Sequence, residues 1–176
     1  MPEHLQPRNP GRVPNLPTIT AYLALGANLG DRVRQLDEAV ARLSAAGVQV
    51  DARSPLYETD AVSDDPQPPY LNAVVRVETT LPPDDLLALG LAIERHLGRV
   101  RPPGRSKAAR TIDIDVLLYG DQIIDTPRLR IPHPGLLERA FVRIPLADVA
   151  APGLRHPVSG TALDHAVPSP GVRLFR

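Results

Sequence analysis

The sequence contains no cysteine, no tryptophan and no long hydrophobic run. Without cysteine the chain cannot form disulfides, perform thiolate catalysis, or hold an iron–sulfur cluster or a cysteine-type zinc site. No apolar stretch approaches the roughly 20 residues that a membrane-spanning helix requires. The N-terminal residues also lack the hydrophobic segment of a signal peptide. These absences predict a cytoplasmic protein that does not contact membranes.

Excess charge of one sign and aromatic rings are scarce as well. Twenty basic residues balance twenty acidic ones, and the only aromatic residues are four tyrosines and two phenylalanines. A nucleic-acid-binding protein needs a basic excess and rings on which bases stack, so the composition argues against nucleic acid as a partner. Lys107 is the single lysine, and every other cation is an arginine, whose planar guanidinium pairs well with oxyanions.

The length of 176 residues suffices for one domain with its own hydrophobic core. Its apolar residues alternate between strand and helix periods in the order β-α-β-β-α-β, which is typical of a ferredoxin-like α+β sandwich with an antiparallel sheet. Both helices are expected to cover one face of the sheet, and the other face stays open unless loops or a ligand cover it. The expected strands lie at 19–25, 48–57, 71–77 and 112–119, and the expected helices at 33–46 and 83–97.

Proline-rich and polar segments divide the rest of the chain. Residues 1–18 are expected to form a flexible tail, 19–152 the folded domain, and 153–176 a loosely organised C-terminal extension. Two long polar loops are expected inside the domain, at 60–69 and 99–110. After the fourth strand we expect a short hairpin and then short helices.

The most informative local pattern is the pair Asp113 and Asp115 in the fourth expected strand. Strand side chains alternate between faces, so both carboxylates share one face, with Cβ atoms about 7 Å apart. Two like charges on a buried strand resist burial, and a divalent cation such as Mg²⁺ relieves that cost. The alternative is a solvated strand edge with two surface aspartates. The opposite face is expected to be apolar and to hold Ile112, Ile114, Val116 and Leu118.

A cationic loop precedes this acidic pair. Cations beside a carboxylate metal site are what a polyphosphate substrate requires, whereas a solvated run of surface charge is the alternative. The two interpretations differ in geometry, because phosphate-binding arginines would converge on the open sheet face. The loop cations are Arg99, Arg101, Arg105, Lys107 and Arg110.

Three further features carry weaker signals. Residues 26–31 follow a strand and open a helix, and they form either an anion-binding turn or a plain connection. Asn72 offers an amide that suits a polar heterocycle, or it caps a turn. His133 stands between two prolines, where a structural hydrogen bond is the alternative to a ligand contact. No Ser-His-Asp or nucleophile-elbow pattern is present in the sequence.

Seven short motifs occur in a fixed order along residues 19–152. They are Gly-Ala-Asn-Leu-Gly-Asp at 26–31, Tyr-Glu-Thr at 57–59, Tyr-Leu-Asn at 70–72, Ile-Glu at 93–94, Gly-Arg-Val-Arg at 98–101, Arg-Thr-Ile-Asp-Ile-Asp at 110–115 and Ile-Pro-His at 131–133. Each motif alone is modest, but the ordered set closely resembles the 6-hydroxymethyl-7,8-dihydropterin pyrophosphokinase family of folate biosynthesis.

The resemblance implies a ferredoxin-like fold and an enzyme, 2-amino-4-hydroxy-6-hydroxymethyldihydropteridine diphosphokinase. Such an enzyme moves the βγ-diphosphate of ATP to the hydroxymethyl oxygen of the pterin and releases AMP. The resemblance also implies two Mg²⁺ ions held by Asp113 and Asp115, and a monomer whose partners are ATP and a reduced pterin. The implied catalytic residues are Arg99, Arg101, Arg110, Asp113 and Asp115; the implied pterin pocket is Thr59, Val62, Tyr70, Asn72 and Phe141; and the implied nucleotide site is Leu87, Glu94, Arg99, Arg101, Arg110, Val116, Arg128, His133 and Arg139.

The sequence departs from the family pattern in the cationic loop, where residues 105–110 contain neither the tryptophan nor the proline that many members have. We therefore expect altered nucleotide affinity and loop closure. Two other classes of function compete. One is a nucleotidyl- or glycosyl-transferase that uses Asp-x-Asp and a metal, and the other is a ferredoxin-like module that binds RNA or a regulatory ligand. An inactive family member is a further alternative, against which the intact acidic pair and arginines argue.

Overall fold

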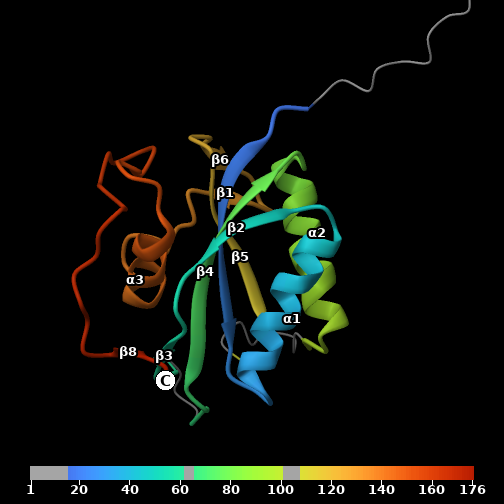
Figure 1. The fold of residues 1–176 in the computed structure, drawn as a ribbon, viewed down its shortest axis with the longest axis vertical. Coiled ribbons are helices and arrows are strands. Elements are labelled where there is room, and N and C mark those ends of the chain that lie inside the picture. Colours follow the sequence, from blue (N-terminus) through green and yellow to red (C-terminus); the bar gives the residue numbers. More distant parts are fainter. Residues whose placement is uncertain (1–15, 62–65, 101–107) are drawn as a thin grey trace, which may run out of the picture.

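The computed structural model describes residues 16–61, 66–100 and 108–176. It confirms the expected ferredoxin-like order of strands and helices (Figure 1). Most of the expected 1–18 tail, together with Val62 and Arg101, lies outside the described residues. The elements of the first part are β1 (Ile19–Ala27), α1 (Arg32–Ala45), β2 (Gln49–Arg53), β3 (Tyr57–Thr59), β4 (Tyr70–Thr79), α2 (Pro83–His96) and β5 (Asp113–Tyr119).

The last part of the chain adds four shorter elements. The expected hairpin is present as β6 (Ile124–Asp125) paired with β7 (Arg130–Ile131). It is followed by α3 (Ala140–Val149) and by β8 (Val172–Leu174). The residues after Pro152 are better organised than their composition indicates, because β8 joins the main sheet and Leu163 is 1% exposed.

The main sheet is antiparallel, with the order β5-β1-β4-β3-β8, and β2 also pairs with β4. The expected second strand is therefore split into β2 and β3. Ser54 lies at the break and stays attached to β4, since its N–H donates to the Val74 carbonyl at 2.9 Å and its hydroxyl accepts from the Val74 N–H at 3.0 Å. Pro55 follows, and it has no N–H to continue a ladder.

Helices α1 and α2 cover one face of the sheet, as predicted (Figure 1). The Asp31 carboxylate caps α1 by accepting from the Arg34 N–H at 3.1 Å. Its apolar stripe packs into a large cluster with the alternating side chains of β1, β4 and β5. The helix ends before Gly47, whose φ of +85° is accessible to glycine at little cost.

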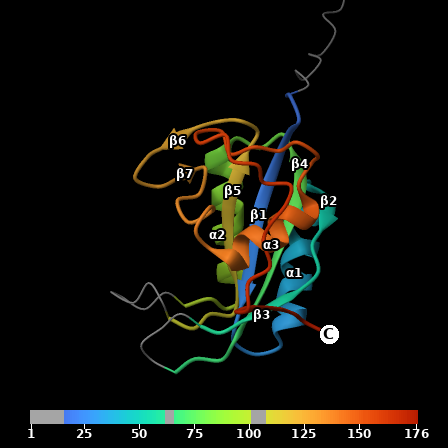
Figure 2. The same cartoon turned by 90° about the vertical axis from the view of Figure 1, so that its left-hand side faces the viewer.

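The opposite face of the sheet is covered by α3 and the chain around it (Figure 2). A second cluster there joins Tyr22 and Val74 of the sheet to Leu136, Leu146 and Leu163. The chain thus covers with its own last third the face that two helices alone leave open. Where α3 begins, sheet residues remain accessible beside it, and these form the pocket described below.

One expectation about β5 is wrong at its end. Leu118 was expected on the face of Ile114 and Val116, but it packs with Leu117 in the cluster under α3. The cause is a bulge: Tyr22 pairs with Leu118 and the next residue of β1 pairs with Val116, so Leu117 has no opposite residue. The acidic pair precedes the bulge and keeps the predicted alternation.

Among the described residues, no helix is long and apolar enough to cross a membrane.

Candidate active site

A pocket of 660 Å³ lies between the start of α3 and the sheet face formed by β1, β4 and β5. The segments that follow β3 and precede β4 close one side of it. Residues predicted separately for catalysis, pterin binding and nucleotide binding converge here. Those that line the pocket are Thr59, Tyr70, Asn72, Arg99, Arg110, Asp113, Asp115, His133, Arg139 and Phe141.

Four predicted nucleotide-site residues lie outside the pocket lining. Leu87 and Val116 belong to the hydrophobic cluster on the helix-covered face of the sheet. Arg128 is exposed in the turn between β6 and β7. Glu94 lies behind the pocket wall and contacts Arg99, which lines the pocket. These four assignments remain predictions.

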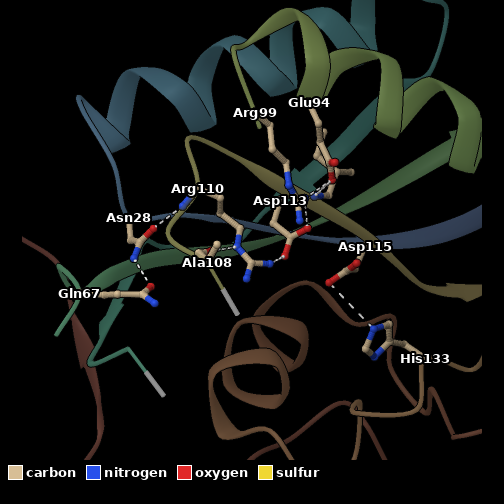
Figure 3. Close-up of polar contacts among 10 residues, drawn as sticks. Asn28, Gln67, Glu94, Arg99, Ala108, Arg110, Asp113, Asp115 and His133 are labelled. Atoms are coloured by element: carbon tan, nitrogen blue, oxygen red, sulfur yellow. Dashed lines mark hydrogen bonds and ion pairs between the residues drawn. The ribbon is translucent and has the colours of Figure 1, made fainter. Parts of the chain in front are cut away.

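Asp113 is held by two arginines (Figure 3). Arg99 binds its Oδ1, and Nη1 of Arg110 lies 2.6 Å from its Oδ2. Burial acts to raise the pKa of this carboxyl, but Arg99 and then Arg110 outweigh that effect and hold the pKa of Asp113 below its usual value. Asp113 therefore stays ionised, and two ion pairs at the pocket wall balance its charge and hold it in place.

Asp115 has the opposite character. It lies on the same face of β5, and burial, followed by the charges of Asp113 and Glu94, raises its pKa to about 7. Its side chain remains 42% exposed, and the carboxylate faces the pocket, with Nε2 of His133 at 3.9 Å from Oδ2 (Figure 3). A cation entering the pocket meets an accessible carboxylate whose negative charge is poorly compensated.

His133 is held by one hydrogen bond at its backbone and one at its ring. Its N–H donates to the Leu117 carbonyl at 2.9 Å, and its Nδ1 accepts from the Gly135 N–H at 3.0 Å. Burial, followed by the charge of Arg139, lowers the pKa of His133. A neutral ring whose Nδ1 accepts must carry its hydrogen on Nε2, so the ring points an N–H donor into the pocket beside Asp115. The structural hydrogen bond is therefore present, and the ring also lines the pocket.

Glu94 organises this side of the site from behind. It is 1% exposed, and its Oε1 accepts from the Ile114 N–H at 2.8 Å and lies 2.7 Å from Nη1 of Arg99. One buried carboxylate from α2 therefore fixes both the backbone of β5 and the arginine that binds Asp113. The family resemblance implied that Glu94 lies near the nucleotide, but the sequence gave no sign of these contacts, which join residues from two different elements.

The other end of the pocket is built around Asn72 of β4. Its Nδ2 donates to the Thr59 hydroxyl at 2.8 Å, which leaves its Oδ1 on the side of Gly26 and the pocket. A side chain at Gly26 would enter this space, because its Cβ would stand 3.3 Å from that oxygen. Tyr70 and Phe141 add ring faces, and each ring lies near an arginine: Arg110 is 5.8 Å from the Tyr70 centroid and Arg139 6.0 Å from that of Phe141.

Asn28 connects the two ends of the pocket, a role that the sequence did not reveal. It is 1% exposed, its Oδ1 accepts from the Arg110 N–H at 2.8 Å, and its own N–H donates to the Arg110 carbonyl at 3.1 Å. Its Nδ2 donates to Gln67 Oε1 at 3.2 Å and to the Pro68 carbonyl at 3.1 Å (Figure 3). The 26–31 turn is thus a clamp between the segments that carry Arg110 and Tyr70.

The chemistry of the acidic pair suits Mg²⁺ that shares its coordination with a ligand. Within the described ranges, no group of three or more His, Asp or Glu side chains has the geometry of a metal site. Mg²⁺ typically binds one or two protein carboxylates and completes its shell with water and substrate phosphates. Asp113 and Asp115 supply such a pair, and the raised pKa of Asp115 reflects negative charge that a cation would stabilise.

Fold and site together define a ferredoxin-like α+β protein whose pocket presents carboxylates and arginines to a phosphate-bearing ligand. Residues 22–151 match the family model of 7,8-dihydro-6-hydroxymethylpterin-pyrophosphokinase (HPPK). This match spans most of the chain and includes every pocket residue named above. The chain belongs to this family.

Relatives agree with that assignment, and solved structures share the fold. The chain is 45% identical over 130 residues to the 2-amino-4-hydroxy-6-hydroxymethyldihydropteridine pyrophosphokinase of Bacillus subtilis. The aligned region covers 73% of this chain and 77% of the relative. The chain is 42% identical over 142 residues to the folic acid synthesis protein fol1 of Pneumocystis carinii. That aligned region covers 81% of this chain but only 19% of the longer protein. A crystal structure of Plasmodium falciparum HPPK-DHPS with pteroate shares the fold, with a TM-score of 0.64 at 17% identity over 84% of this chain and 41% of that one.

Proposed function

We propose that this chain transfers the βγ-diphosphate of ATP to the hydroxymethyl oxygen of 6-hydroxymethyl-7,8-dihydropterin and releases AMP. The single observation that carries the proposal is the pair Asp113 and Asp115 in one pocket wall, with Arg99 and Arg110 bound to the first and the second left accessible. Membership of the family and the name of the Bacillus relative support the same step of folate biosynthesis.

The acceptor end of the pocket suits a pterin. A pterin ring is flat, and it carries neighbouring hydrogen-bond donors and acceptors. The amide of Asn72, oriented by Thr59, would read that polar edge, and the rings of Tyr70 and Phe141 would contact its faces. Val62 completes the proposed pterin set and lies outside the described residues.

The nucleotide end suits a chain of phosphates. Arg99, Arg110 and Arg139 line the pocket, and the Nε2–H of His133 points into it. Guanidinium groups bind phosphate oxygens in a fork, so they stabilise the charge that develops on the AMP leaving group. Arg101 belongs to this proposed set but lies outside the described residues. Four further residues of the proposed nucleotide set lie outside the pocket lining and would be near the nucleotide only where it extends beyond the pocket. They are Leu87, Glu94, Val116 and Arg128.

Asp113 and Asp115 would hold the two Mg²⁺ ions that accompany ATP. When bound, Mg²⁺ neutralises phosphate charge and lowers the pKa of a coordinated hydroxyl. The chain's own residues do the positioning: Glu94 fixes Arg99, Arg99 and Arg110 fix Asp113, and β5 sets the spacing of the two carboxylates. Phosphoryl-type transfer depends chiefly on such alignment and charge neutralisation, because the attacking and leaving oxygens must lie in line.

The deciding experiment identifies the nucleotide product. The protein is incubated with MgATP and 6-hydroxymethyl-7,8-dihydropterin, and the nucleotides are separated. We expect AMP that forms only when the pterin is present, and none from Asp113→Ala or Asp115→Ala. The exposed Asp121→Ala is the matched control and should retain activity. ADP or free pyrophosphate as the product would instead indicate another phosphotransferase or a nucleotidyltransferase and contradict the proposal.

A further inference from the structure

The strand β8 extends the sheet beside β3, at the edge nearest the acceptor end of the pocket. Tyr57, Glu58 and Thr59 pair with β8 on one side and with β4 on the other. β8 lies beyond residue 151, where the match to the family model ends. In both views the chain after α3 returns to this edge, so that β8 and β3 lie side by side (Figures 1 and 2). A strand as short as β3 gains most of its order from its neighbours.

Side chains of β8 and the residue after it extend this pairing. Nη2 of Arg173 lies 2.9 Å from Oδ1 of Asp60 and 3.9 Å from Oε1 of Glu58. The N–H of Phe175 donates to the Leu56 carbonyl at 2.8 Å, and its ring packs against the main hydrophobic cluster. The C-terminal strand therefore holds both ends of β3.

Arg32, at the start of α1, connects β3 with the segment that precedes β4. Its Nη1 donates to Oε2 of Glu58 at 2.9 Å and to the Pro69 carbonyl at 2.8 Å. Its guanidinium lies over the Phe175 ring, 5.7 Å from the centroid. Phe175 thus covers the arginine that connects β3 itself with the segment before β4.

Both of these segments line the acceptor end of the pocket. Thr59 ends β3 and is followed by Asp60 and Ala61, whereas Gln67 lies in the segment before β4 and Tyr70 begins β4. The Thr59 hydroxyl in turn accepts from Nδ2 of Asn72 and so orients the Asn72 amide, which faces the pocket. The acidic pair lies on β5, at the other side of the sheet, with β1 and β4 between. Contacts made by β8 therefore reach one end of the pocket and not the other.

We infer that β8 is a positioning element for the acceptor substrate: Arg173 and Phe175 hold the wall formed by residues 59–61 and so set the affinity for the pterin without touching it. This inference rests on the proposed function in naming the acceptor. A strand that only stabilised the fold would change the thermal midpoint and both substrate affinities together. A positioning strand changes the affinity for one substrate.

The test compares Arg173→Ala, Arg173→Lys and Phe175→Ala in the full chain, with Arg155→Ala as the control. Arg155 is an exposed arginine of the same C-terminal region whose guanidinium donates only locally, to the Gly160 carbonyl. KM is measured separately for the pterin and for ATP. Because exposed ion pairs are weak, we expect Arg173→Ala to raise the pterin KM about threefold and Phe175→Ala about tenfold, with the ATP KM and kcat within about twofold of the parent. Arg173→Lys should restore most of the loss.

Backbone hydrogen exchange gives a readout that needs no substrate. In Arg173→Ala and Phe175→Ala, the amides of residues 59–61 and 70 should exchange faster, while those of α2 keep the parent rates. Equal increases in both KM values, unchanged exchange at 59–61, or a loss in Arg155→Ala as large as in Arg173→Ala would overturn the inference. Absence of pterin-dependent AMP from the parent protein would instead contradict the proposed function, and the exchange data would still decide the role of β8.

Discussion

Asp113 and Asp115 lie two residues apart on one face of β5, and their pKa values are shifted in opposite directions. Burial disfavours the charge of both. At Asp113 the arginines Arg99 and Arg110 overcome that effect, whereas at Asp115 the negative charges of Asp113 and Glu94 add to it. Neighbouring carboxyl groups with opposite environments commonly divide a catalytic task between them. In the proposed reaction the first would be a fixed anchor and the second would receive incoming positive charge.

The first prediction concerns stability at Asp115. Its folded-state pKa of about 7 lies above the ordinary 3.8, so the folded protein binds this proton more tightly than the unfolded chain. The contribution of Asp115 to stability is therefore present below about pH 3.8 and is lost as the pH rises through about 7. In magnesium-free buffer at pH 8, Asp115→Asn should raise the thermal midpoint by about 2–4 °C. In a separate assay with MgATP and the pterin, the same variant should show no turnover.

The control for this prediction is Asp121→Asn, which removes an exposed carboxylate and should leave both midpoint and turnover unchanged. The stabilising effect of Asp115→Asn should also shrink as the pH is lowered toward 5, because the parent carboxyl becomes protonated. A lower midpoint for Asp115→Asn at pH 8 would contradict this account of the site.

The second prediction concerns Glu94, which supports Arg99 and the Ile114 N–H from behind the wall. Glu94→Ala leaves a buried guanidinium and a buried N–H without this partner, so it should destabilise the protein by about 3–5 kcal/mol. Glu94→Gln keeps an oxygen for the N–H and should cost less. Urea denaturation measures both, and equal losses for the two variants would show that the charge of Glu94 carries the whole effect and that the oxygen kept by glutamine does not reduce the loss.

The sequence was sufficient to predict what depends on local pattern. The shared face of Asp113 and Asp115 follows from strand alternation, and α1 from its apolar spacing and Gly47. The bulge that moves Leu118 to the other face was beyond reach, because it depends on how β5 is registered against β1. Only the resemblance to a family connected Asn72 with Asp115, since the two belong to strands separated by β1 in the sheet.

Contacts between distant segments were the part that no local pattern indicated. Asn28 read as a turn residue, yet its side chain binds backbone and side-chain groups from two other segments. The C-terminal residues 153–176 are polar and contain several prolines, which is typical of loose structure. They are ordered by the edge of β3, by the cluster under α3, which receives Leu163, and by the main cluster, against which Phe175 packs. All three contain residues of the sheet that come far earlier in the chain.

The third prediction concerns the acceptor end. Gly26→Ala would place a Cβ 3.3 Å from Oδ1 of Asn72, which must then shift from its position beside Thr59. Overpacking of this kind costs on the order of 1–3 kcal/mol, so the pterin KM should rise about tenfold. The ATP KM serves as the internal control and should stay within about twofold of the parent. An increase in the ATP KM as large as that of the pterin KM would show that the pocket is not divided in this way.

The last prediction concerns Asn28, whose amide holds the Arg110 backbone with its oxygen and the Gln67 and Pro68 oxygens with its nitrogen. Asn28→Asp keeps the shape and the contact to Arg110 but replaces both donor bonds with a carboxylate oxygen facing the Pro68 carbonyl. Asn28→Ala removes all side-chain contacts. Leaving buried groups unpaired costs about 1–3 kcal/mol, so both variants should be less stable than the parent.

The two variants separate the halves of the clamp. Asn28→Asp releases only the 67–68 segment and should mainly weaken pterin binding, whereas Asn28→Ala also frees the Arg110 backbone and should lower kcat further. Steady-state kinetics with each substrate varied in turn, beside urea denaturation, distinguish these effects. If Asn28→Asp kept the kcat and the pterin KM of the parent while Asn28→Ala lowered kcat, the clamp would act through Arg110 alone, because Asn28→Asp keeps that contact, which leads to the arginine bound to Asp113.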